Sequence, residues 1–295
     1  MAKPFLKWAG GKGRLLAQIL PRLPVLPEGG YNYYEPFLGG GALFFQLESE
    51  GMVKTAHLSD INPELILCYL TIQNDVELLI EELKRLEKKF PKRDAYRKKF
   101  FYTIREKWNE KLCTSVDDFS PKNAAKRVAK TIFLNKTCFN GLFRVNSKGG
   151  FNVPYGYYKN PSFVNEENLR AVSKALQCAV ITCQPYDALS LEAKENFVYF
   201  DPPYRPLTTS SSFTAYSKSG FNDDNQRELA NFVTKISPAA CIMLSNSDPR
   251  NTNENDLFFD ELYDEFTIDR IMAPRSINSD GEGRGKIPEI LVTNY

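Results

Sequence analysis

The sequence has 295 residues, and 42% of them are hydrophobic. This is enough to bury the core of one large α/β domain, or of a core domain with an insertion. No run of apolar residues is long enough for a membrane-spanning helix, and the N-terminus lacks the apolar stretch of a signal peptide. We therefore expect a cytoplasmic protein with no membrane partner.

The cysteines and the single histidine argue against two kinds of chemistry. None of the six cysteines forms a C-x-x-C pair, so the sequence predicts reduced, mostly buried thiols and no metal site. His57 is the only histidine. A Ser-His-Asp triad or a histidine-based metal site is therefore not expected.

The net charge of +2 hides a strongly basic segment. Residues 84–136 contain 17 Lys or Arg and 6 Asp or Glu, a local charge of +11, which leaves the rest of the chain at −9. Segregation of this kind favours a surface that faces a polyanion. Solvated helix faces explain a charge run equally well, so both interpretations stay open.

Seven short apolar or β-branched runs predict strands, with helical patterns between several of them. The expected strands are 31–36, 56–59, 179–182, 197–200, 239–245, 266–272 and 289–294. Asn62 as a cap and Pro63 at the first helical position predict a helix that ends near Asn74, and 166–176 and 223–236 are expected crossover helices. Alternation of strand and helix predicts an open, largely parallel sheet. The loop 273–288 is expected to join the last two strands into an antiparallel hairpin at the sheet edge.

The middle of the chain has a different pattern. Residues 75–136 are rich in helix formers and aromatic residues, whereas 138–154 are polar and contain the turn signals Asn-Gly and Lys-Gly-Gly. We therefore expect a helical insertion that carries a projecting β-hairpin at 75–160. The core domain is then formed by 1–74 and 161–295.

A glycine-rich turn follows the first expected strand, in the sequence Glu35-Pro36-Phe37-Leu38-Gly39-Gly40-Gly41. Glycines at a strand-to-helix turn let the backbone approach a ligand closely. Asp60 ends the next strand, where an acid can accept hydrogen bonds from both ribose hydroxyls of a nucleoside. Phe44 stands where a dinucleotide fingerprint needs its third glycine, so a nucleoside without a pyrophosphate fits better than a hydride carrier. An ordinary tight turn is the alternative.

A second pair of glycines lies between Trp8 and Lys12. It is not a phosphate-binding loop, because Leu6 and Gly13 stand where that motif needs Gly and Ser or Thr. Trp8 offers a ring face to a sulfonium cation, and Lys12 offers a charge to a carboxylate. A buried tryptophan beside a surface lysine is the alternative.

The most specific signal is the tetrapeptide Asp201-Pro202-Pro203-Tyr204, at the carboxyl end of an expected strand, where open α/β sheets bind ligands. The lone pair of an adenine amino group is delocalised, so two acceptors aimed at its N–H bonds favour the tetrahedral nitrogen that forms during methyl transfer. Asp201 and the Pro202 carbonyl can supply them, and Tyr204 offers a ring to stack on an extruded base. A Pro-Pro turn with an Asp cap is the alternative. The chemistry alone also permits cytosine N4 or an RNA base as the acceptor.

Six segments in this order resemble the Dam-type branch of adenine-N6 DNA methyltransferases over nearly the whole chain. They are 5–12, 35–41, 60–62, 140–144, 151–156 and 201–204. The resemblance implies a Rossmann-like methyltransferase sheet of about seven strands and a site-specific, S-adenosylmethionine-dependent enzyme that acts on double-stranded DNA. Many relatives have a non-glycine residue in the middle of the 39–41 triplet, so the turn in this chain departs from the family pattern.

The resemblance also implies roles for individual residues. The S-adenosylmethionine pocket is lined by Trp8, Lys12, Phe37, Gly39, Asp60 and Asp201. The flipped adenine is held by Asp201, Pro202 and Tyr204. The DNA is read by Lys7, Asn140, Leu142, Arg144 and Pro154, while Phe139 wedges into the base stack. GATC is the expected target.

We expect a monomer without metal that transfers the methyl group in one direct displacement. A restriction-modification pair and a solitary enzyme are both compatible with the sequence. A non-catalytic DNA-binding protein would explain the basic segment and the hairpin. It would not explain why the glycine-rich turn, Asp60 and the tetrapeptide occur together.

Overall fold

The computed structural model describes residues 1–191, 195–206, 221–274 and 286–295, so most of the expected loop at 273–288 lies outside the described residues. The strands are β1 (Tyr31–Glu35), β2 (Val53–Asp60), β3 (Ala179–Cys183), β4 (Asn196–Phe200), β5 (Ala240–Ser247), β6 (Thr267–Pro274) and β7 (Lys286–Thr293). The helices are α1 (Leu16–Ile19), α2 (Ala42–Ser49), α3 (Pro63–Lys89), α4 (Asp94–Asn109), α5 (Pro121–Thr137), α6 (Glu166–Ala175), α7 (Asp223–Ile236) and α8 (Phe258–Leu262). None of these helices is long and apolar enough to cross a membrane.

The seven strands form one sheet in the order β3-β2-β1-β4-β5-β7-β6. Strands β2, β1, β4 and β5 are parallel neighbours, and β7 is antiparallel to both β5 and β6. All seven strand predictions and the antiparallel edge pair are therefore confirmed, with ends that shift by up to three residues. This strand order is that of a Rossmann-like methyltransferase sheet.

The strand order reverses between β1 and β4. From β1 the chain proceeds outward to β2, and from β4 it proceeds outward to β5 in the opposite direction. Open α/β sheets bind their ligands outside the carboxyl ends of the two strands that flank such a reversal. Glu35 ends β1 and Asp201 directly follows β4, so both sequence motifs begin at this point of the sheet.

The chain divides into two compact units. Unit 1 comprises 1–11, 38–51 and 59–184, and unit 2 comprises 12–37, 52–58 and 185–295. The insertion expected at 75–160 falls within unit 1, whereas the expected core domain contributes to both units. The boundaries at 75 and 160 stay predictions.

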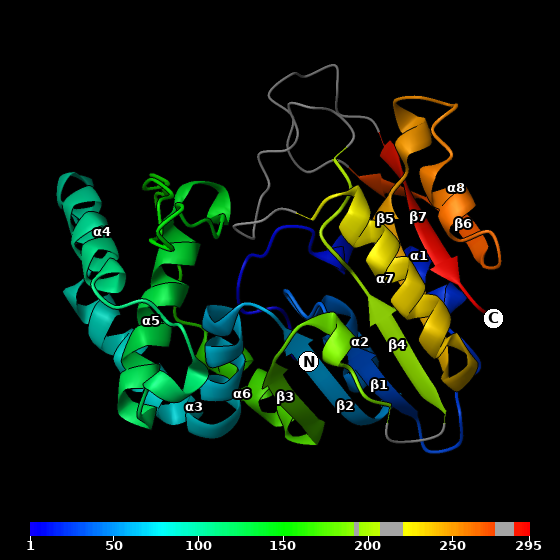
Figure 1. The fold of residues 1–295 in the computed structure, drawn as a ribbon. Coiled ribbons are helices and arrows are strands. Elements are labelled where there is room, and N and C mark those ends of the chain that lie inside the picture. Colours follow the sequence, from blue (N-terminus) through cyan, green and yellow to red (C-terminus); the bar gives the residue numbers. More distant parts are fainter. Residues whose placement is uncertain (192–194, 207–220, 275–285) are drawn as a thin grey trace. The chain divides into compact units, whose positions relative to one another are not determined.

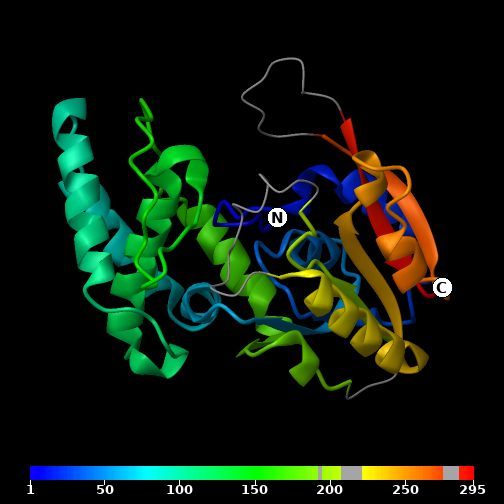
Figure 2. The same ribbon diagram turned by 45° about the horizontal axis from the view of Figure 1, so that its top comes forward.

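In unit 1, α3 packs against α5 and α6, and α5 packs against α4 (Figures 1 and 2). A buried ion pair joins these helices: the Arg127 guanidinium donates to both oxygens of Glu64 at 2.9–3.1 Å, and Thr131 donates to the same carboxylate. The guanidinium also lies 3.8 Å from the ring centroid of Trp108 on α4. Removal of one partner from such a buried pair costs about 3–5 kcal/mol, because the other charge is left unpaired.

Helix α3 is longer than expected. Asn62 caps it through bonds from the N–H groups of Glu64 and Leu65, as predicted. The expected end near Asn74 coincides with a kink at Asp75, where φ is −135° and ψ is 37°, but the helix then continues to Lys89. Residues 79, 80 and 83 beyond the kink are buried at helical spacing, so tertiary packing extends the helix past its local break.

In unit 2, α7 packs along one face of β4 and β5 (Figure 1). Leu229 and Val233 of α7 are fully buried against Val198 of β4 and Leu244 of β5. This apolar layer covers one face of the strands and holds the end of β4 in place. Successive side chains of a strand alternate between its two faces, so Asp201, three residues beyond Val198, belongs to the face away from α7.

Candidate active site

The carboxylate of Asp201 is held asymmetrically in unit 2. Lys12 Nζ lies 2.6 Å from Asp201 Oδ1, and Ser245 Oγ donates to the same oxygen at 2.9 Å. No described residue donates a hydrogen bond to Oδ2. The Lys12 side chain is only 5% exposed, so this pair is shielded from water. One oxygen is thus tied into the fold while the other remains available as an acceptor.

The ring of Tyr204 is contacted at two points. Lys12 Nζ lies 4.5 Å from the ring centroid, and the hydroxyl donates to Glu289 Oε2 at 2.7 Å. Burial, together with the charges of Asp201 and Glu289, holds the pKa of Tyr204 well above its ordinary value, so the hydroxyl stays protonated and continues to donate. No aromatic ring of the described chain stacks on Tyr204.

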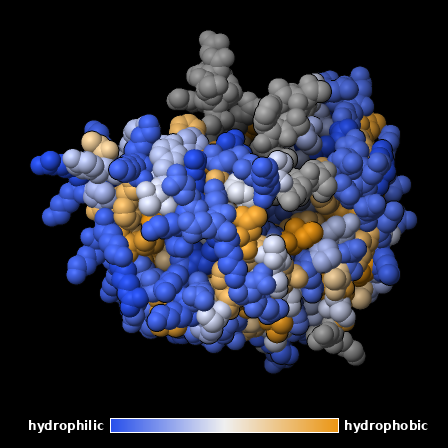
Figure 3. All heavy atoms as spheres, turned by 60° about the vertical axis from the view of Figure 1, so that its left-hand side comes forward, coloured by the Kyte–Doolittle hydropathy of each residue, from blue (hydrophilic) through white to orange (hydrophobic). Residues whose placement is uncertain are grey.

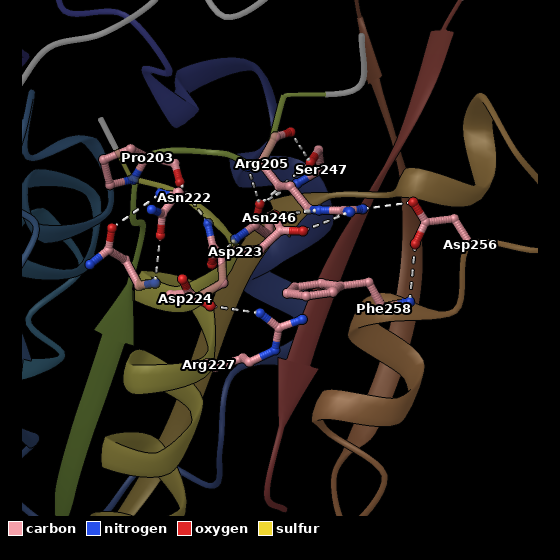
Figure 4. Close-up of polar contacts among 12 residues, drawn as sticks. Pro203, Arg205, Asn222, Asp223, Asp224, Arg227, Asn246, Ser247, Asp256 and Phe258 are labelled. Atoms are coloured by element: carbon pink, nitrogen blue, oxygen red, sulfur yellow. Dashed lines mark hydrogen bonds and ion pairs between the residues drawn. The ribbon is translucent and has the colours of Figure 1, made fainter. Parts of the chain in front are cut away.

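The backbone of the tetrapeptide is tied down by amide side chains (Figure 4). Gln226 donates to the Pro203 carbonyl at 3.0 Å, and the Arg205 N–H donates to Asn246 Oδ1 at 3.1 Å. Asn246 in turn donates to Gln226 at 3.1 Å, which joins the two anchors. The Pro202 carbonyl receives no hydrogen bond from the described residues, so it is left as an acceptor next to two fixed positions.

Arg205 clamps the end of the tetrapeptide to two other segments of unit 2 (Figure 4). It donates to both oxygens of Asp223 at 2.8 and 2.9 Å and to Asp256 at 2.7 Å. Its guanidinium lies 4.4 Å from the ring centroid of Phe258. These bonds lower the pKa of Asp223, which keeps that carboxylate ionised. A bidentate pair stacked on a ring restricts both position and orientation.

Phe37 follows β1 at the level where Asp201 follows β4. Tyr34 pairs with Val198, and each of the two motif residues lies three positions beyond that pair. Phe37 stacks on Tyr186 at a centroid distance of 5.3 Å and meets Phe221 edge-on at 6.1 Å. An apolar aromatic wall therefore stands beside the switch point in unit 2.

In unit 1, the glycine-rich turn and Asp60 are bonded to each other. Asp60 accepts from the Gly39 N–H at 3.1 Å and from the Asn62 N–H at 2.9 Å. Burial raises the pKa of Asp60, while these backbone bonds act in the opposite direction. Gly41 has φ of 63°, and a Cβ there would lie 2.8 Å from the Tyr69 hydroxyl, so the turn requires glycine at that position.

Trp8 and Lys7 connect the N-terminal segment of unit 1 to its hairpin. The Trp8 ring stacks on Phe143 with centroids 5.1 Å apart and planes 25° apart. The fully buried Asn135 accepts from the Lys7 N–H, and its amide donates to the carbonyls of Lys7 and Gly141. The segment that bears Trp8 is therefore fixed to the segment that bears the expected DNA-reading residues.

The expected β-hairpin at 138–154 is present only as a loose antiparallel loop. Two isolated bridges, Cys138 to Tyr155 and Val145 to Phe151, replace a regular ladder. The turn 139–141 is a short 3-10 segment in which Asn140 and Gly141 have φ of 55° and 66°. Left-handed residues so close to the first bridge prevent continuous strand pairing, which the turn signals alone did not reveal.

Burial separates the side chains of this loop into two groups. Those of Phe143, Phe151, Val153 and Tyr155 are buried. The predicted DNA-reading residues Phe139, Asn140, Arg144 and Pro154 are exposed, and Leu142 is half-buried. Arg144 Nε donates to Asn152 at 2.8 Å, which orients its guanidinium. The buried group thus holds the loop in place and the exposed group faces outward.

The basic segment lies on helices α3 to α5 of unit 1, and the face brought forward in Figure 3 is mostly hydrophilic. Lys130 shows how closely its charges are placed. Burial, and then the charges of Arg127, Lys107 and Lys126, lower the pKa of Lys130. The positive charges around Lys130 therefore lie close enough to act on its ammonium group.

Sequence reasoning missed the partners that fix the site. Ser245, Glu289, Arg205 and Asn246 were not singled out. Arg205 directly follows the tetrapeptide, and Glu289 is a single carboxylate within an apolar strand, so both carried a weak signal. In the described chain, no cluster of three or more His, Cys, Asp or Glu residues is placed to hold a metal ion.

Comparisons with known proteins agree on one family. Residues 8–277 match the model of the D12 class N6 adenine-specific DNA methyltransferases. The Type II methyltransferase M.MjaIII of Methanocaldococcus jannaschii is 48% identical over 99% of both chains. M1.LlaDCHI of Lactococcus lactis, also a Type II methyltransferase, is 37% identical over 99% of this chain and 95% of that protein. The DNA adenine methylase of Vibrio cholerae is 35% identical over 98% and 95%.

Among the solved structures that match is that of SMU.472 complexed with SAH, with a TM-score of 0.40 and 10% identity over 99% of this chain and 54% of that one. This TM-score is too low to show a common fold. The fold class therefore rests on the strand order of this chain itself.

Proposed function

Because the chain belongs to the D12 class of N6 adenine-specific DNA methyltransferases, we propose that it methylates adenine within GATC after extruding the base from the duplex. S-adenosylmethionine supplies the methyl group. Names of the relatives include both Type II methyltransferases and DNA adenine methylases. The greater similarity to M.MjaIII favours a restriction-modification setting for this chain.

The extruded adenine is proposed to bond through its amino group to Asp201 Oδ2 and the Pro202 carbonyl. Both atoms accept no bond from the described residues, while their neighbours, Asp201 Oδ1 and the Pro203 carbonyl, are occupied. Two acceptors on the amino hydrogens draw the nitrogen lone pair out of conjugation and favour the tetrahedral nitrogen. Tyr204 then offers its ring to the base.

Lys12 is proposed to serve both Asp201 and the carboxylate of S-adenosylmethionine. An ammonium group has three donors, so its bond to Asp201 does not preclude a second anionic partner. Phe37 is proposed to contact the adenosyl moiety, since its aromatic cluster stands at the carboxyl end of β1.

The ribose hydroxyls of S-adenosylmethionine are proposed to donate to Asp60. Each carboxylate oxygen has two lone pairs, so the bonds from Gly39 and Asn62 leave acceptor capacity. The glycine-rich turn lets the backbone come close to the cofactor. Trp8 is proposed to meet the sulfonium side of the cofactor with its indole ring.

The exposed side chains of the 138–154 loop are proposed to read the target sequence. An arginine bonds both acceptors of guanine in the major groove, a contact worth about 1–3 kcal/mol of discrimination. Arg144 is exposed and oriented for such a contact. Lys7, Asn140, Leu142 and Pro154 are proposed to contact DNA beside it, and Phe139, which is 52% exposed, to fill the space left by the base.

The observation that carries the proposal is the sheet switch point. The two motifs follow neighbouring parallel strands, β1 and β4, at the place where the strand order reverses. An ordinary tight turn after β1, or a Pro-Pro turn with an Asp cap after β4, does not require that the two motifs lie side by side at this place.

The test is to incubate the protein with S-adenosylmethionine and DNA of mixed sequence and to map every methylated base. N6-methyladenine confined to GATC is the expected result. N6-methyladenine at another sequence would contradict GATC as the target. A target adenine that stays stacked in the duplex when the enzyme is bound would contradict base extrusion. Asp264→Ala is a matched control for Asp201 variants, because Asp264 is an exposed aspartate with no ion pair among the described residues.

A further inference from the structure

Strand β7 brings a carboxylate to the same face of the sheet as Asp201. Ile290 and Val292 of β7 are fully buried in the apolar layer beneath α7, so Glu289 belongs to the opposite face. Glu289 pairs in register with Ser247 of β5, two residues from Ser245, which donates to Asp201. Two carboxylates thus share one face of unit 2.

Glu289 is unusual in its surroundings. Its neighbours in the strand are apolar, and burial raises the pKa of Glu289 while Lys12 and the Tyr204 hydroxyl lower it. An ionisable group that is partly desolvated destabilises the fold unless its partners compensate. The one hydrogen bond that its carboxylate accepts from the described residues comes from Tyr204, at 2.7 Å.

This bond completes the restraint of the Tyr204 ring. The tetrapeptide holds the backbone of Tyr204, Lys12 lies over one face of the ring, and Glu289 holds the hydroxyl at the far end. A phenol ring anchored at Cα alone still rotates about its side-chain bonds. A hydrogen bond at its tip fixes the direction of the long axis of the ring, while Lys12 over one face restrains rotation about that axis.

We propose that Glu289 is a positioning residue that fixes the direction of the Tyr204 ring against which the extruded adenine stacks. The inference rests on the proposed function, because it presupposes that Tyr204 holds the base. The carboxylate acts through Tyr204 and does not contact the substrate. Its effect therefore falls on the rate of methyl transfer more than on the binding of S-adenosylmethionine or DNA.

The test is a double-mutant cycle measured in single-turnover methylation of DNA at its mapped site. Glu289→Ala is expected to slow transfer about tenfold, the size expected for losing a bond to an ionised group. Glu289→Met removes the acceptor without leaving a cavity and should match Ala. Glu289→Gln keeps an acceptor oxygen and should stay within about threefold of the parent rate. Glu265→Ala, at an exposed glutamate, is the matched control.

The cycle is closed with Tyr204→Phe, which keeps the ring and removes the hydroxyl. If Glu289 acts through that hydroxyl, the Tyr204→Phe/Glu289→Met variant is no slower than the slower single variant. If the double variant is slowed by the product of the two single factors, Glu289 does not act through the Tyr204 hydroxyl and the proposal is wrong. Methyl transfer at the parent rate by Glu289→Met would also refute it. Tyr204→Ala separates this from the proposed function: parent-like transfer by that variant would refute base stacking on Tyr204 itself.

Discussion

Replacing Asp201 by alanine has two consequences that the structure allows to be separated. The first is a loss of stability. Lys12, whose side chain is 5% exposed, would keep its charge without the carboxylate that lies 2.6 Å away. Breaking a buried pair costs about 3–5 kcal/mol. We expect the lower end of this range, because Asp201 is 19% exposed and Glu289 also attracts Lys12.

The second consequence is a loss of catalysis. Removing one preorganised group that stabilises a developing charge slows a reaction about 100- to 1000-fold, and Asp201 supplies one of two proposed acceptors. Asp201→Asn keeps the bond from Ser245, because an amide oxygen still accepts, but it also removes the negative charge beside Lys12. Adding Lys12→Met to Asp201→Asn removes the positive charge that the carboxylate had balanced, so this double variant should regain part of the stability.

The assays are thermal unfolding and single-turnover methylation, with DNA binding measured in parallel. We expect a lower unfolding midpoint for Asp201→Ala, at least 100-fold slower methyl transfer, and DNA affinity within about threefold of the parent. Methyl transfer by Asp201→Ala within tenfold of the parent rate would refute the role of this carboxylate. An unchanged unfolding midpoint would refute the importance of its pair with Lys12.

Three further predictions concern unit 1. Arg144→Ala should lower discrimination at one base position by about 1–3 kcal/mol and leave S-adenosylmethionine affinity unchanged; mapping of methylated sites tests this, and full-rate methylation confined to the original sequence would contradict it. Gly141→Ala should weaken DNA binding, because a Cβ there would clash with the Lys7 side chain at a φ of 66°; titration of labelled duplex measures the loss, and parent-like affinity would contradict it. Arg127→Met should destabilise the protein by about 3–5 kcal/mol by leaving Glu64 unpaired, and chemical denaturation checks this. An Arg127→Met/Glu64→Gln variant should recover most of that loss.

Local sequence patterns were sufficient to predict the strands and to place two motifs at the strand ends where ligands bind. Apolar or β-branched runs of four to seven residues with turn signals on each side identify the strands. The runs that became β1 and β4 are buried throughout, because neither face of such a strand meets water. The tetrapeptide and the glycine-rich turn each follow such a run, so both could be placed at the carboxyl ends of strands. Their meeting at the switch point required the strand order, which no local pattern contains.

The partners of the site could not be predicted, because they come from distant parts of the chain. Glu289 is 85 residues from Tyr204, and Lys12 reaches Asp201 from the N-terminal segment. Which of many carboxylates meets which donor is decided by strand register and is invisible in the sequence. Register is set by the burial of the other face, here by Ile290 and its neighbours.

The hairpin shows the opposite case, in which a local signal was present but incomplete. Asn-Gly at 140–141 predicted a turn, and a turn is present. The ladder expected beyond it is reduced to two bridges, because the left-handed residues 140 and 141 interrupt the pairing. The apolar side chains of Phe143 and Phe151 pack on each other and on Trp108 of α4, which holds the loop in place.

Two hydrogen-bond acceptors of the tetrapeptide are bonded within the fold, and two others are left for the substrate. Asp201 Oδ1 and the Pro203 carbonyl are bonded to Lys12, Ser245 and Gln226, while Asp201 Oδ2 and the Pro202 carbonyl receive no bond from the described residues. The two remaining acceptors thus keep their capacity for an incoming amino group, whereas the bonded ones have already used theirs. The bonded neighbours at the same time prevent the segment from turning away to satisfy these acceptors itself. The stability of the segment and its readiness to bind an amino group thus arise from the same contacts.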